Sequence, residues 1–127
     1  VQFNLLDTTI RAPYGQALFE GIVSDSTSKE EFEKLKGELM ELGKAYFDEP
    51  MEEYGLDAVL SINNWNAGQA AVAHYPCLTV PMGYEDSGEP VNMTFIARTM
   101  EEEKLLKIGY AFEQLTKARM APDLFKD

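Results

Sequence analysis

The chain has one cysteine, one histidine and no long apolar run, and each shortage excludes a class of protein. A lone cysteine cannot form a disulfide within the chain, so the cysteine content does not favour an oxidising compartment. A membrane-spanning helix needs about 20 consecutive apolar residues, and no stretch of the sequence approaches that length. Because the N-terminal residues also lack the basic and apolar pattern of a secretion signal, we expect a cytoplasmic protein.

Basic residues are also scarce, since 11 lysines and arginines stand against 22 acidic residues and give a formal net charge of −11. Binding to nucleic acid or to an anionic membrane requires a basic surface, and the sequence contains no basic stripe. We therefore expect neither nucleic acid nor a membrane as a partner. The sequence has no glycine-rich phosphate loop and no dinucleotide-binding motif, so we expect no cofactor.

The chain contains no proline-, glycine- or serine-rich linker. Its 127 residues, 45% of them hydrophobic, suit one compact domain with a single core. We therefore expect residues 1–127 to form a single domain. The first residue is Val1 rather than methionine, which favours a piece of a longer protein.

The periodicity of apolar residues predicts an α/β chain. Helical spacing occurs in three segments: 13–23, 28–47 and 100–119. Residues 63–76 form a long irregular stretch, which we expect to be partly helical around 67–73. Strand patterns occur in three: 58–62, 77–84 and 91–97. The first strand is apolar on both faces, which is typical of a central strand. The short acidic and glycine-containing turn between the other two predicts an antiparallel hairpin.

The helix predicted over 28–47 has a single apolar stripe along its length. Its start is marked by two overlapping capping boxes, at Thr27 and Ser28. The stripe residues are separated by steps of three and four and therefore share one helical face: Phe32, Leu35, Leu39, Leu42 and Tyr46. Such a stripe must pack on a larger structure. Gly37 and Gly43 each weaken the helix interior by about 1 kcal/mol, so we expect the helix to depend on tertiary packing.

The chain's only histidine and only cysteine, His74 and Cys77, suggest a thiol nucleophile with its base. Residues three apart on an extended chain point to opposite faces, however, and Pro76 between them restricts the backbone further. A cysteine before an apolar strand is more often a small buried hydrophobe. The pattern favours a scaffold role. We also expect no metal site, because there is no clustered third ligand.

Asn63, Asn64 and Trp65 follow directly after the first predicted strand. Ligands of open α/β sheets bind beyond the carboxyl ends of strands, where amides offer hydrogen bonds and an indole offers a flat apolar wall. These three residues are therefore candidates for substrate binding. The alternative is an ordinary turn with Trp65 packed into the core.

Three stretches follow one another in a characteristic order: "GLDAVLSI", "HYPCLTVPMGYEDSGEPVNMTFIAR" and "MEEEKLLKIGYAFEQLTKAR". In order and spacing they resemble the C-terminal part of the amidase-signature hydrolases, closely over residues 55–122 and more loosely before. The resemblance implies the C-terminal part of that fold, with a mixed sheet of about three strands covered by about three helices. In this family the loop after the first strand helps to line the acyl pocket, and here it reads "SINN" at residues 61–64.

The resemblance implies that the full-length enzyme hydrolyses a small carboxamide to acid and ammonia with a Ser-Ser-Lys catalytic set. No residue here can be assigned to that set, which belongs to the upstream part of such enzymes. We therefore expect this chain to be inactive alone and to need the N-terminal catalytic portion of the same protein. An isolated fragment would expose an apolar sheet face and a sheet edge, and would self-associate.

Two alternatives remain open at this point. One is a non-catalytic binding or assembly module on the amidase scaffold, which would be monodisperse and have no large apolar patch. The other is a hydrolase that uses Cys77 and His74, which would lose its activity in Cys77→Ala.

Overall fold

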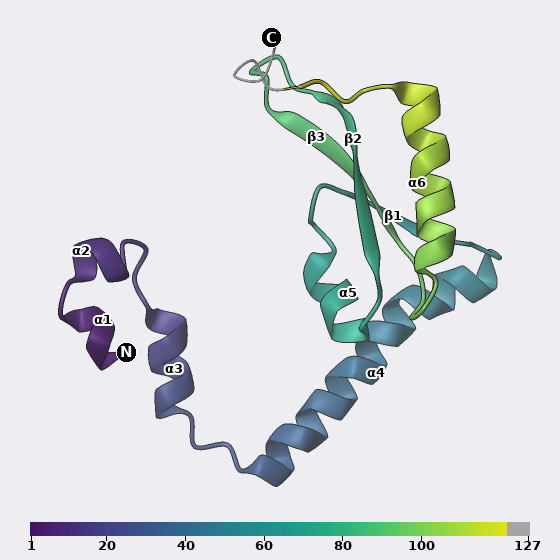
Figure 1. Cartoon of the computed structure of the whole chain (residues 1–127). Coiled ribbons are helices and arrows are strands. Elements are labelled where there is room, and N and C mark those ends of the chain that lie inside the picture. Colours follow the sequence, from purple (N-terminus) through teal and green to yellow (C-terminus); the bar gives the residue numbers. More distant parts are fainter. Residues whose placement is uncertain (122–127) are drawn as a thin grey trace. The chain divides into compact units, whose positions relative to one another are not determined.

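The computed structural model describes residues 1–121, and the chain forms two compact units, Val1–Leu35 and Lys36–Asp127 (Figure 1). Residues 122–127, the end of the predicted single domain, lie outside the described part. No helix within residues 1–121 combines the length and the apolar character needed to cross a bilayer.

The first unit contains three short helices, α1 (Gln2–Leu5), α2 (Thr8–Arg11) and α3 (Ala17–Ser24). The helix predicted over 13–23 starts four residues late, because a turn with Gly15 at φ +78° precedes it. Gln16 is the only buried residue among residues 1–35, and its side-chain oxygen accepts a hydrogen bond from Asn4 Nδ2 at 3.1 Å. The unit therefore has no hydrophobic core of its own.

Helix α4 (Lys29–Glu53) begins where the sequence predicts and ends later. The Ser28 hydroxyl accepts a hydrogen bond from the Glu31 amide at 3.2 Å, which confirms one of the two predicted caps. The helix continues past residue 47 and through Pro50 to Glu53. Gly55, with φ +62°, follows the helix end in a left-handed conformation. Proline removes one backbone donor, and this loss is tolerated here because Phe47 and Met51 are buried on either side of it.

The predicted apolar stripe of α4 is not the face that packs in the described residues. The stripe side chains Phe32, Leu35, Leu39, Leu42 and Tyr46 are 52–68% exposed. The buried positions of α4 are Gly43, Phe47 and Met51. A Cβ atom on Gly43 would lie 2.8 Å from Val72 Cγ1 and 3.0 Å from the Ala73 nitrogen. This glycine therefore permits the close approach of α5 (Ala67–Ala73), which forms over the segment predicted to be partly helical.

The sheet has three strands, β1 (Val59–Ile62), β2 (Cys77–Tyr84) and β3 (Pro90–Ile96), in the order β1-β3-β2 (Figure 1). Both pairs are antiparallel, which confirms the predicted hairpin of β2 and β3. The prediction of a central first strand is wrong, because β3 lies between the other two and leaves β1 at an edge. The α/β class and the three strands are as predicted.

Helix α6 (Glu102–Thr116) covers one face of the sheet (Figure 1). Leu105 is buried with Val80 and Phe95, and Phe112 packs on Phe95 with ring centroids 5.6 Å apart. Gly109 has no room for a Cβ atom because the Leu78 side chain occupies that space.

The opposite face of the sheet changes character along its length. Near one end, Ile96 and Val59 pack in a second cluster with residues of α4, of α5 and of the segment after α5: Phe47, Met51, Ala70, Ala73 and Tyr75. Two residues further along each strand, on the same face, the register pairs Ser61 with Thr94 and Thr94 with Thr79. This face is therefore apolar beneath the helices and polar beyond them.

Candidate functional site

A polar hollow of about 370 Å³ lies at the carboxyl end of β1, beyond the helix-covered part of the sheet. It is lined by Asn63, Asn64, Thr79, Glu89, Pro90 and Asn92. Two of the three residues predicted to bind substrate, Asn63 and Asn64, are among its lining residues. Thr79, Glu89 and Asn92 were missed at the sequence level, although the alternation of polar and apolar residues in β3 already places Asn92 and Thr94 on one face.

Asn63 is held in a left-handed conformation, with φ +49°, by bonds to β3. Its amide donates to the Asn92 carbonyl at 2.9 Å, and its side-chain oxygen accepts from the Asn92 amide at 2.8 Å. The Thr94 hydroxyl donates to the Asn63 carbonyl oxygen. Asparagine adopts this conformation more readily than other non-glycine residues. The turn after β1 is therefore tied to the central strand.

Asn64 and Trp65 occupy the turn between this anchor and α5. The Asn64 side chain is exposed and makes no hydrogen bond to residues 1–121. Trp65 is 76% exposed, so the alternative of a core tryptophan is wrong for the described part of the chain. Trp65 is not among the residues that line the hollow. A role of Asn63, Asn64 and Trp65 in substrate binding stays a prediction.

The electrostatic character of the hollow is set by Glu89, the one charged residue among those that line it. The remaining lining side chains are amides, a hydroxyl and a proline. Such a surface offers hydrogen bonds to neutral polar groups and repels anions.

His74 and Cys77 do not form a catalytic pair in the structure. His74 ends α5 in a left-handed conformation, φ +59°, and its carbonyl accepts a hydrogen bond from the Thr99 hydroxyl at 3.2 Å. The Cys77 thiol points instead to the Tyr75 carbonyl, with its sulfur 3.9 Å from that oxygen. Desolvation raises the pKa of the Cys77 thiol, which disfavours the thiolate. Cys77 is exposed, so the expectation of a buried cysteine is wrong, whereas the absence of a bond to His74 supports the scaffold interpretation of this stretch.

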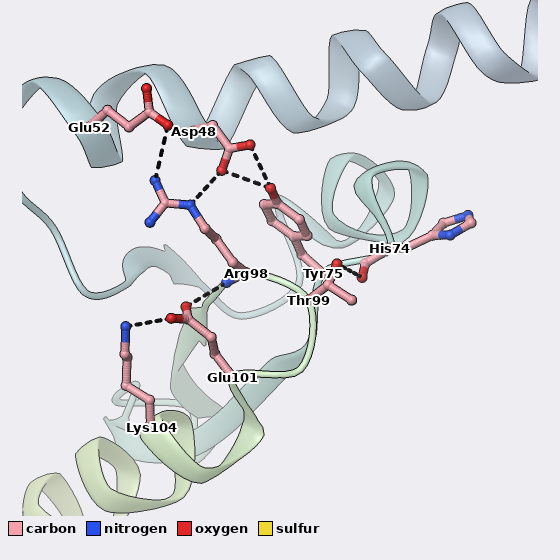
Figure 2. A network of polar contacts seen from close by, with 8 residues as sticks. All are labelled: Asp48, Glu52, His74, Tyr75, Arg98, Thr99, Glu101 and Lys104. Atoms are coloured by element: carbon pink, nitrogen blue, oxygen red, sulfur yellow. Dashed lines mark hydrogen bonds and ion pairs between the residues drawn. The ribbon is translucent and has the colours of Figure 1, made fainter.

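A polar network joins α4 to the segment between β3 and α6 (Figure 2). The Asp48 carboxylate accepts a 2.7 Å hydrogen bond from the Tyr75 hydroxyl and a 2.8 Å one from Arg98 Nε. The Arg98 amide donates to Glu101, which pairs with Lys104 at 2.7 Å. Sequence analysis missed this network, because its members are far apart in the chain.

The pKa shifts in the network follow from these contacts. Burial, together with the hydrogen bond to Asp48, raises the pKa of Tyr75 to about 12. The bond to Lys104 lowers the pKa of Glu101, and the bond to Asp48 raises the pKa of Arg98. Each contact thus stabilises the protonation state that makes the hydrogen bond: the neutral phenol of Tyr75, the carboxylate of Glu101 and the guanidinium of Arg98. Such contacts are typical of a network with a structural role. The network does not line the hollow.

A second hollow, of about 430 Å³, is apolar and lies between α4 and α5. It is lined by Leu39, Leu42, Gly43, Tyr46, Gly68, Gln69 and Val72. Three of the exposed stripe residues of α4 thus form one of its walls. Within residues 1–121, no group of three or more histidine, cysteine or acidic side chains is arranged to hold a metal ion.

No protein-family model matches the chain. Among curated proteins, a probable amidase of Arabidopsis thaliana is 30% identical over 86% of this chain, which corresponds to 21% of that protein. A glutamyl-tRNA(Gln) amidotransferase subunit from Syntrophus aciditrophicus is 40% identical over 53% of this chain and 12% of its own length. The chain therefore spans about a fifth or less of these relatives.

Solved structures resemble nearly the whole chain. An amidase family protein from Bacillus anthracis superimposes with a TM-score of 0.88 and 41% identity, over 96% of this chain and 24% of that one. The peptide amidase of Stenotrophomonas maltophilia gives a TM-score of 0.82 and 28% identity, over 98% of this chain and 28% of its own.

Proposed function

Because this chain is an amidase-family segment, we propose that residues 1–127 form the C-terminal segment of a longer hydrolase that cleaves a carboxamide to acid and ammonia. The observation that carries the proposal is the match to the Bacillus anthracis amidase family protein, with 41% identity and a TM-score of 0.88. A match of fold and sequence together over 96% of the chain favours a shared role in the enzyme. We place the reaction in the cytoplasm.

The catalytic residues of this enzyme belong to the part of the protein that precedes the segment. The family resemblance assigns a Ser-Ser-Lys set upstream, and neither the lining of the hollow nor the Asp48 network contains a serine. His74 and Cys77 make no contact that could activate the thiol. The segment alone is therefore inactive in this proposal.

The upstream catalytic portion also supplies the packing that the segment lacks. None of the hydrophobic side chains in residues 1–35 is buried, and the α4 stripe and the apolar hollow beside it are open. Strand β1 is at an edge of the sheet, with Leu60 56% exposed. An apolar surface of this extent is typical of a site covered by another part of the protein. The same surface would make the separated segment self-associate.

The segment contributes one wall of the substrate pocket, at the hollow lined by Asn63 and Asn64. Asn64 offers an amide that can donate to a substrate carbonyl and accept from a substrate N–H. Trp65 supplies an adjoining apolar surface. Because Glu89 is the only charged lining residue, we expect neutral amides to be preferred over amides that carry a carboxylate.

Ammonia release tests the proposal directly. The full-length protein that contains this segment should release ammonia from neutral primary amides, and residues 1–127 alone should release none. Mixing the purified segment with a separately expressed upstream portion should restore activity. A full-length protein that releases no ammonia from a panel of aliphatic, aromatic and peptide amides would overturn the proposal. A segment that remains monodisperse and ignores the upstream portion would instead favour the binding or assembly module.

A further inference from the structure

We propose that Thr94 and Asn92 are positioning residues for substrate binding, which fix Asn63 and thereby present Asn64 to the substrate. The inference rests on the proposed function and extends it from the lining of the hollow, which includes Asn92, to the buried Thr94, which does not line it. Its basis is a set of hydrogen bonds between β3 and the turn after β1.

The side-chain and backbone oxygens of Asn63 are both engaged by these bonds. Its side-chain oxygen accepts from the Asn92 amide at 2.8 Å and from Asn92 Nδ2 at 3.3 Å, and its carbonyl accepts from the Thr94 hydroxyl. A side chain whose acceptor is already shared by two donors is a poor ligand for substrate N–H groups. As an acceptor, Asn63 therefore acts on substrate through the conformation that it gives to the turn.

The direction of the hydrogen bonds across the sheet follows from proton counting. Thr94 has one hydroxyl hydrogen, and the Asn63 carbonyl can only accept, so Thr94 donates to Asn63. The 2.8 Å contact between the Thr79 and Thr94 hydroxyls must then have Thr79 as the donor. The hydroxyls of β2 and β3 thus form a directed chain that ends on the turn after β1. Each bond in such a chain strengthens the next.

The other end of the turn is anchored separately. The Ser61 hydroxyl accepts from the Asn66 amide at 3.3 Å, and the Asn66 side chain donates to the Tyr46 hydroxyl at 3.1 Å. Asn64 and Trp65 lie between these two anchors. Asn64 has an exposed side chain without a hydrogen bond to residues 1–121, so it is the amide available to substrate.

Loss of the Thr94 hydroxyl removes the bond to the carbonyl of a left-handed residue and leaves only the bonds from Asn92 to hold it. Thr94 is 6% exposed, so water is poorly placed to replace the missing donor. Asn63 then relaxes toward an ordinary backbone conformation, and Asn64 moves away from the hollow. Substrate binding weakens, whereas the chemical step, carried by upstream residues, is unchanged.

The test uses steady-state kinetics of the full-length enzyme with a neutral primary amide. Thr94→Val should raise KM about 5- to 10-fold with kcat within about twofold, as expected for the loss of a binding interaction present equally in the ground and transition states. Thr94→Ser keeps the hydroxyl and should restore KM to within about twofold of wild type. Thr116→Val removes a threonine hydroxyl that bonds only within α6, and it should leave both constants unchanged.

A double-mutant cycle separates positioning from a structural role. Asn64→Ala should raise KM, and adding Thr94→Val to it should raise KM no further, because both changes remove the same contact. Additive effects, or a normal KM in Thr94→Val beside a raised KM in Asn64→Ala, would overturn the positioning role and leave the proposed function intact. A wild-type protein without amidase activity would overturn the proposed function.

Hydrogen exchange gives a readout that needs no substrate. The Asn63 amide, which donates to the Asn92 carbonyl, should exchange at least about tenfold faster in Thr94→Val than in Thr94→Ser. If Thr94→Val fails to fold, Thr79→Val serves instead, since it removes only the donor to Thr94. Equal exchange rates in the folded variants would refute the inference whatever the activity of the enzyme.

Discussion

At the scale of single residues, the best-defined chemistry belongs to the network around Asp48. This carboxylate accepts hydrogen bonds from Tyr75 and Arg98, which come from different parts of the chain (Figure 2). Tyr75 is 8% exposed, and its hydroxyl bonds to a charged acceptor, a type of bond that contributes about 1.5–3 kcal/mol. The network therefore fixes α4 relative to the segment that follows β3.

Alkaline titration should detect Tyr75 among the six tyrosines. Its pKa is raised from 10.0 to about 12 by burial and by Asp48, so the native state favours the protonated phenol. The resulting stabilisation is fully present below pH 10 and is lost as the pH rises through about 12. Phenolate absorbance should show a component near pH 12 that is missing in Tyr75→Phe. An identical titration of the two proteins would contradict the assignment.

At the scale of elements, the two glycines inside α4 have opposite surroundings, and only Gly43 belongs to the contact with α5. Gly43 faces α5, where a Cβ atom would come within 2.8 Å of Val72. Gly37 has no atom within 4 Å of the position of a Cβ atom. Their spacing along the helix gave no sign of this difference, because both weaken an isolated helix equally.

The two glycine-to-alanine variants should therefore change stability in opposite directions. Gly43→Ala should lower the free energy of unfolding by about 1–3 kcal/mol, because it overpacks a close helix contact. Gly37→Ala should raise it by about 0.5–1 kcal/mol, because alanine is the better helix former and meets open space. Urea denaturation followed by circular dichroism measures both, in the full-length protein. Stabilisation by Gly43→Ala would mean that α4 and α5 do not approach as described.

At the scale of the whole molecule, the chain exposes more apolar surface than its own core can explain. Its buried hydrophobic residues all belong to the unit from Lys36 onward. In that same unit, Leu39, Leu42 and Tyr46 of the α4 stripe line the apolar hollow and stay uncovered. In the proposed longer hydrolase, the upstream portion covers this surface.

Substitution in the apolar hollow should weaken assembly with the upstream portion without unfolding the segment. Leu42 is 68% exposed and lines this hollow, so Leu42→Glu should reduce the restored activity of a mixture of the two portions at least about tenfold. Leu115 is 86% exposed on α6 and lies outside the hollow, and Leu115→Glu is the matched control. Equal restoration by both variants would exclude the hollow as part of the assembly surface. Circular dichroism of each variant segment checks that the fold is retained.

Several features of the fold were predictable because they depend on local sequence. The cap at Ser28, the bounds of β2 and the segment of α5 follow from capping chemistry, strand alternation and apolar content within a few residues. The hairpin of β2 and β3 follows from a short turn. The candidate site at Asn63 and Asn64 was also found from sequence, because polar residues directly after an apolar strand are visible without a structure.

Other features required contacts between distant residues, and the sequence could not supply them. An edge strand and a central strand can have the same apolar composition, so only the pairing with β3 places β1 at the edge. The stripe of α4 has perfect helical spacing, yet the face that packs within the segment contains Gly43, Phe47 and Met51. Local periodicity reports that a face is apolar, whereas tertiary structure decides which partner covers it.

The sequence by itself determined the three strands and the approximate positions of the helices after residue 12, but not α1 or α2. It also determined the resemblance to amidases and the residues after β1 where a substrate contact is expected. Tertiary structure alone decided that the Cys77 thiol faces the Tyr75 carbonyl, that Asp48 joins Tyr75 to Arg98, and that Asn63 is bonded to Asn92 and Thr94. The physical reason is that capping, turn and strand preferences act over a few residues, whereas the hydrogen bonds of Asp48 and Asn63 join residues 27 to 50 positions apart in the chain.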